Sequence, residues 1–80
     1  MAEIGKLVLN NRTADVIYSV DYESGIVDIA DLDKEAYQLL ASIDVGKKVT
    51  LQRSDGNRLN LLVKRLTMGQ HIQCEAVIEK

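Results

Sequence analysis

The sequence has 80 residues, a net charge of −2 and a single cysteine. A chain of this length is expected to form one domain over residues 1–80, and one cysteine excludes an internal disulfide. No unbroken run of apolar residues exceeds three, and residues 1–6 show no positively charged region followed by an apolar one, so we expect neither a membrane span nor a signal peptide. We therefore expect a cytoplasmic protein in a reducing compartment.

The N-terminal third is predicted to form three short strands. Residues 4–10 and 14–20 are separated by Asn10-Asn11, and asparagine tolerates the positive φ of a tight turn. The alternation of apolar and polar side chains over 14–20 is typical of a half-buried strand. A polar turn then leads into a third strand over residues 26–29, with Val27 and Ile29 facing inward.

A helix is predicted to follow the third strand. Asp31 is expected to be its N-cap, because a carboxylate there accepts hydrogen bonds from free backbone N–H groups. Gly46 follows the predicted end, where a left-handed residue often ends a helix. One apolar stripe at helical spacing is expected to face the core: Leu32, Ala36, Leu39, Leu40 and Ile43.

The last third is predicted to be a three-stranded meander. Apolar and polar residues alternate over 49–52 and again over 59–63, and Asp55-Gly56 between them is a strong hairpin signal. A further alternation over 72–78 indicates the last strand.

The order of elements is therefore βββ-α-βββ, which predicts a single α+β domain with one helix packed on one face of an antiparallel sheet. The same order suits a small closed barrel, because an OB-type barrel carries a helix between its third and fourth strands. Alternation alone does not separate an open sheet from a closed barrel, so both arrangements stay open.

The second face of the predicted sheet is not uniformly polar. Five aliphatic residues have the parity of the face away from the helix: Val8, Ile17, Leu62, Leu66 and Val77. Barrel curvature would bury some of them within one chain, a second copy or a partner protein would cover them from outside, or they are scattered exposed aliphatics. The second interpretation predicts a contact surface.

Charge is distributed unevenly along the chain. Residues 1–40 hold three basic and eight acidic side chains, a net charge of −5, whereas residues 41–80 hold seven basic and four acidic ones, a net charge of +3. Such polarity can steer a partner or promote association between copies. The basic residues of the hairpin are Lys47, Lys48, Arg53, Arg58, Lys64 and Arg65.

The basic hairpin over residues 47–65 permits a second function, namely nucleic-acid binding through phosphate contacts. The aromatic residues Tyr18, Tyr22 and Tyr37 all lie outside this hairpin, however, whereas single-strand binders stack bases on aromatic side chains. Nucleic acid is therefore the less favoured partner.

Groups for catalysis or metal binding are sparse in the sequence. His71 and Cys74 lie three positions apart on a predicted strand, so their side chains point to opposite faces and cannot form a dyad. Asp31-Leu32-Asp33 matches a D-x-D pattern, but a helix N-terminus explains these carboxylates without a metal. We expect no catalytic residues, no metal and no cofactor.

The sequence thus predicts a non-enzymatic interaction module, an accessory or regulatory protein that binds another protein and forms a homodimer. Its partner-binding residues are expected to be Ile17, Leu62, Leu66, Val77, Lys48 and Lys64. The aliphatic residues would supply apolar contact area, and the lysines would supply orientation, because charges at a rim affect steering more than affinity.

Overall fold

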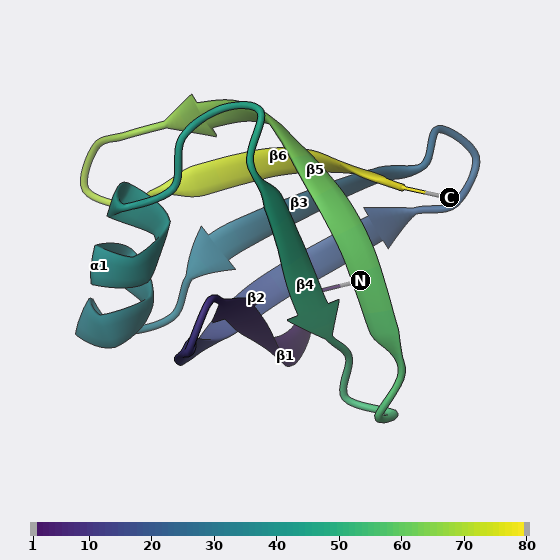
Figure 1. Ribbon diagram of the computed structural model, residues 1–80, viewed down its shortest axis with the longest axis horizontal. Helices are drawn as coiled ribbons and strands as arrows, with labels where there is room; N and C mark the ends of the chain where they lie inside the picture. The colour runs from purple at the N-terminus through teal and green to yellow at the C-terminus, as the bar shows by residue number, and fades with distance from the viewer. Residues whose placement is uncertain (1, 80) are drawn as a thin grey trace.

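Six antiparallel strands close into a barrel in the computed structural model, which describes residues 2–79 (Figure 1). The elements in chain order are β1 (Glu3–Leu9), β2 (Arg12–Asp21), β3 (Ile26–Asp31), α1 (Lys34–Ala41), β4 (Lys48–Gln52), β5 (Arg58–Thr67) and β6 (Gln73–Ile78). Around the barrel the strands follow the order β1-β2-β3-β6-β5-β4, and β4 pairs back onto β1. The predicted α+β class and order of elements are confirmed, and the closed barrel is the arrangement that forms.

The alternation of the strands supplies the core. Because side chains of a strand point alternately to its two faces, every second residue enters the barrel. The largest fully buried side chains are Tyr18, Leu7, Ile29, Leu39, Leu40, Leu51, Leu61, Ile72, Val16, Val27, Val63 and Cys74. These side chains come from every strand and from α1, so one core fills the barrel.

Helix α1 lies at one end of the barrel, beside β2 and β3 (Figure 1). Ala36, Leu39 and Leu40 are buried there and continue the core of the barrel, as the predicted stripe requires. Leu32 departs from that prediction, because it precedes the helix and is 42% exposed.

The predicted N-cap of α1 was wrong by two residues. Asp33 is the N-cap, and its Oδ1 accepts a hydrogen bond from the backbone N–H of Ala36 at 2.9 Å. Asp31 is instead the last residue of β3, and its Oδ1 accepts from the backbone N–H of Ile72 at 2.8 Å. Asp31 therefore ties the end of β3 to the segment that leads into β6.

Two turns use the residues that their backbone conformation requires. Asn10 has a φ of 57° between β1 and β2, and Gly56 has a φ of 90° between β4 and β5. Asparagine and glycine are the residues that adopt this left-handed region at least cost. The hairpin signals of Asn10-Asn11 and Asp55-Gly56 are therefore confirmed.

Strand β5 contains an irregularity that moves one predicted surface residue inside. The pairing of β5 with β6 shifts register between Val63 and Arg65, which is a β-bulge. After the bulge, Leu66 is the register partner of the buried Cys74 and packs against the core. The prediction that Leu66 lies on the outer face was wrong, because the extra residue reverses the alternation.

Candidate interaction surface

The outer wall of the barrel carries three aliphatic side chains in one row over β5, β6 and β3. Leu62 is the register partner of Val77, and Val77 is in turn the register partner of Ile26. All three are partly buried, and their immediate neighbours in the strands enter the core. We call Ile26, Leu62 and Val77 the seam patch. Since the core is filled without them, the fold itself does not require aliphatic residues at these positions.

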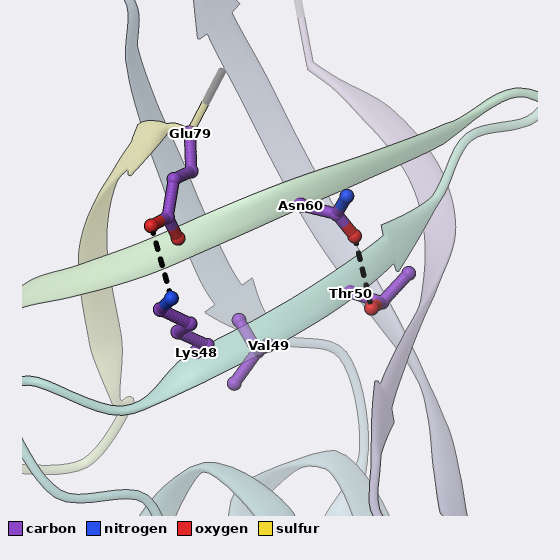
Figure 2. Close-up of a pocket in the computed structure, with 5 residues that line it drawn as sticks. All are labelled: Lys48, Val49, Thr50, Asn60 and Glu79. Carbon is purple, nitrogen blue, oxygen red and sulfur yellow. Dashed lines mark hydrogen bonds and ion pairs between the residues drawn. The ribbon is translucent and has the colours of Figure 1, made fainter.

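A shallow hollow of about 280 Å³ lies beside the seam patch (Figure 2). Its lining residues are Lys48, Val49, Thr50, Asn60 and Glu79. Lys48 is the register partner of Leu62, and its Nζ lies 3.2 Å from Oε1 of Glu79, the residue that follows β6. The Thr50 hydroxyl donates to Oδ1 of Asn60 at 3.5 Å.

The polar groups of this hollow are available to a partner. The Lys48 side chain is 72% exposed, and an ion pair in contact with water contributes only about 0–1 kcal/mol. The Lys48 ammonium group and the Glu79 carboxylate can therefore give up their contact and bind groups on a docked molecule instead, at little cost in free energy. An apolar row beside such a polar border has the composition of a protein interface, with an apolar centre and a polar rim.

Ile17 belongs to a different apolar surface. On the outer wall it is the register partner of Ile4 on β1 and of Ala30 on β3. Ile4 is 57% exposed. We call Ile4, Ile17 and Ala30 the β1–β2 patch.

The β1–β2 patch does not continue into the seam patch. Their residues on β3, Ala30 and Ile26, lie four positions apart, which corresponds to about 13 Å along a strand. The exposed Asp28 lies between them on the same face. The seam patch and the β1–β2 patch are therefore separate surfaces.

The predicted partner-binding residues are thus only partly brought together. Lys48, Leu62 and Val77 are neighbours on one wall, and Lys64 is exposed at the bulge of β5. Ile17 lies on the other patch, and the partly buried Leu66 packs against the core. Ile26 and Ile4 were missed as contact residues, although the inward assignment of Val27 already implied that Ile26 points outward.

The basic residues of the hairpin do not form one continuous surface. Lys48 is paired with Glu79. Arg58 and Arg65 lie near opposite ends of β5, and a separation of seven positions corresponds to about 23 Å along a strand. The positive charges of Arg58 and Arg65 are therefore far apart along β5.

Arg53 is held back against the end of the barrel. Its guanidinium lies 5.8 Å from the ring centroid of Tyr22, with ion pairs of 4.0 Å to Glu3 and 3.9 Å to Asp55. The neighbouring Tyr18 hydroxyl is the main cause that raises the pKa of Arg53; desolvation opposes this rise, and the nearby Tyr22 and Asp55 add to it. In the described residues, neither that hydroxyl nor Nε of Arg53 reaches hydrogen-bond geometry with a partner, so proximity alone joins the two groups.

His71 and Cys74 lie in opposite environments. Cys74 is 1% exposed inside the barrel, and burial raises the pKa of its thiol to about 11, with a further contribution from Asp28. The His71 side chain is 74% exposed, and its Nδ1 lies 3.5 Å from Oδ1 of Asp31. The predicted separation of the two side chains is confirmed, although His71 precedes β6 and does not lie on a strand.

Within residues 2–79, no group of three His, Cys, Asp or Glu side chains is arranged to hold a metal ion. In the same part of the chain, no helix has the length and apolar character needed to cross a membrane. Comparisons with protein-family models, with curated proteins and with solved structures found no match.

Proposed function

We propose that this chain is a small non-enzymatic interaction module, an accessory or regulatory protein that binds another protein and associates with itself. The observation that supports this most directly is the presence of aliphatic side chains outside a barrel whose core is already filled. Apolar groups held in water cost free energy, which is recovered when a partner covers them.

The separation of the two patches supports two different contacts. The seam patch, with Lys48 and Lys64 beside it, has the polar rim of an interface. The β1–β2 patch contains Ile4, the more exposed of its two isoleucines. We assign the β1–β2 patch to the partner protein and the seam patch to self-association.

The environment of the reactive side chains supports a non-enzymatic role. The thiolate is the nucleophilic form of cysteine, and the buried Cys74 thiol with its raised pKa stays protonated at neutral pH. The free, buried thiol also agrees with a cytoplasmic location, which we propose as well.

The test is a pull-down with the tagged chain from a lysate of its source, with and without nuclease. We expect one protein in stoichiometric amount that survives nuclease and is lost with Ile17→Asp. The matched control is Val45→Asp, because Val45 is 61% exposed and lies outside both patches. Val45→Asp should retain the partner.

The opposing result is nuclease-sensitive recovery of nucleic acid, which would replace this proposal with a nucleic-acid-binding module. In that case added salt would reduce binding steeply, because each phosphate contact releases counterions. The double variant Lys48→Glu/Lys64→Glu would then abolish recovery, and Ile17→Asp would leave it unchanged.

A further inference from the structure

The strand order of the barrel separates charge in space. β1, β2 and β3 are neighbours on one side of the barrel, and β4, β5 and β6 are neighbours on the other. Strands β1, β2 and β3 hold two basic and five acidic residues, a net charge of −3, whereas β4, β5 and β6 hold four basic residues and one acidic residue, a net charge of +3, so one side is acidic and the other is basic. The asymmetry along the sequence thus becomes an asymmetry across the fold.

The seam patch lies where the two sides meet. Ile26 is on β3, the last strand of the acidic side, whereas Leu62 and Val77 are on strands of the basic side. The next row of outward residues repeats this order with charges. Asp28 on β3 and Arg65 on β5 are both register partners of Glu75 on β6.

Asp28 and Arg65 therefore flank the middle strand on opposite sides. Both are exposed. Neighbouring strands are roughly 4.8 Å apart, so each of the two lies about one strand spacing from Glu75. The row of aliphatic residues thus has an anion on its β3 side and a cation on its β5 side.

We propose that two copies of this chain pack seam patch against seam patch, about a twofold axis parallel to β6. This rests on the proposed function and specifies its self-association. With this axis, β5 of one copy faces β3 of the second copy. Leu62 then meets Ile26 of the second copy, and Arg65 meets Asp28 of the second copy. Each contact occurs twice, because a twofold interface is isologous.

The charges select this axis over the perpendicular one. A twofold axis across the strands would place the basic β5 side against itself and the acidic β3 side against itself, and like charges at an interface are unfavourable. With the axis along β6, Glu75 lies near the axis. Its register partner Arg65 in each copy offsets the repulsion between the two Glu75 carboxylates.

The first experiment measures molar mass by size-exclusion chromatography with light scattering, over a wide range of concentration. We expect twice the chain mass of 8.9 kDa for the unaltered protein and the monomer mass for Val77→Asp. The matched control is Val8→Asp, because Val8 is a partly buried outward valine on β1, three strands from β6 in either direction. Val8→Asp should remain a dimer, and circular dichroism checks that both variants fold.

The second experiment exchanges charges between copies. Arg65→Asp and Asp28→Arg are each expected to weaken the homodimer by about tenfold or more, because each sets like charges against each other twice. A mixture of the two variants should form heterodimers. In that pairing the aspartate introduced by Arg65→Asp meets the arginine introduced by Asp28→Arg, so that opposite charges face each other there again.

Two results would overturn this inference. One is a chain that stays monomeric at every concentration, and the other is a dimer that Val77→Asp or the charge exchange leaves unchanged. Either result leaves the partner-binding part of the proposed function in place if the pull-down still recovers a partner protein whose binding Ile17→Asp abolishes. A monomer whose partner protein is instead lost with Leu62→Asp would assign the seam patch to that protein.

Discussion

Gly5 and Tyr18 are in direct contact inside the barrel, because the ring of Tyr18 occupies the space that a side chain at position 5 would need. A Cβ placed on Gly5 would lie 2.7 Å from Cε1 of Tyr18 and 2.7 Å from the backbone oxygen of Gln52. Tyr18 itself is 1% exposed. The missing side chain of β1 is thus replaced by an aromatic ring from β2, which fills the gap that glycine leaves in a sheet.

We predict that Gly5→Ala lowers the free energy of unfolding by about 1–3 kcal/mol, the usual cost of an extra group in a packed core. Urea denaturation gives this value. Gly69→Ala is the control, since a Cβ there would have its nearest neighbour at 4.0 Å and the backbone is not left-handed. Equal stability of the two variants would mean that both the Tyr18 ring and the backbone at Gln52 can move aside.

A second prediction concerns the hydroxyl of Tyr18, which is buried and has no hydrogen-bond partner in the described residues. Tyr18→Phe should change the free energy of unfolding by less than about 1 kcal/mol, because no hydrogen bond is lost. Tyr18→Ala removes the ring and should cost about 3–5 kcal/mol. A large loss with Tyr18→Phe would show that the contact with Arg53 stabilises the barrel end.

The third prediction concerns Cys74, whose thiol has a pKa raised by burial to about 11, from an ordinary value of 9.0. A raised pKa means that the folded state holds the proton more tightly than the unfolded state. The contribution of this pKa difference to the free energy of unfolding is therefore present below about pH 9 and is lost as the pH rises toward 11. Cys74→Ala should remove this decline from the curve of unfolding free energy against pH.

The same burial should protect the thiol from reagents. In the native protein at pH 8, Cys74 should react with a disulfide reagent far more slowly than it does in urea, since access requires opening of the barrel. Rapid labelling of the folded chain would contradict the buried position.

The fourth prediction separates the two aspartates around the start of α1. Asp33→Ala should cost about 1 kcal/mol, whereas Asp33→Ser should restore most of the loss, because serine is also a good N-cap. Asp31→Ala should cost about 1–3 kcal/mol, because the backbone N–H of the buried Ile72 loses its acceptor. Thermal denaturation of the three variants gives these differences. If serine restored stability at position 31 and not at position 33, Asp31 would be the N-cap.

The sequence was sufficient for the strands and the hairpins, whereas the local signal for the N-cap of α1 pointed to Asp31 instead of Asp33. Alternation and turn residues such as Asn10 and Gly56 indicated the strands and hairpins, because these signals act within a few positions. Closure of the barrel depends on pairing of β1 with β4, which are far apart in the chain. An open sheet has the same alternation, so no local pattern could decide between them.

The contact surface was predicted less completely for the same reason. The row of Ile26, Val77 and Leu62 results from the registers of β3, β6 and β5, and these are set by long-range pairing. The bulge near Arg65 carries no glycine or proline in the sequence, so the inward turn of Leu66 could not be read from it. The charge distribution was more informative, because the strands of the acidic first half and those of the basic second half lie on different sides of the barrel.

The last prediction tests this change of face directly. Leu66 packs against the core after the bulge, whereas Leu62 lies outside before it. Leu66→Asp should therefore cost about 1–3 kcal/mol or more, because it places a carboxylate against apolar side chains. Leu62→Asp should leave the monomer within about 0.5 kcal/mol of the unaltered protein, as is usual for surface positions. Urea denaturation at low concentration, where self-association does not contribute, compares the two. If both substitutions unfold the chain, Leu62 is part of the core and the seam patch is not a contact surface.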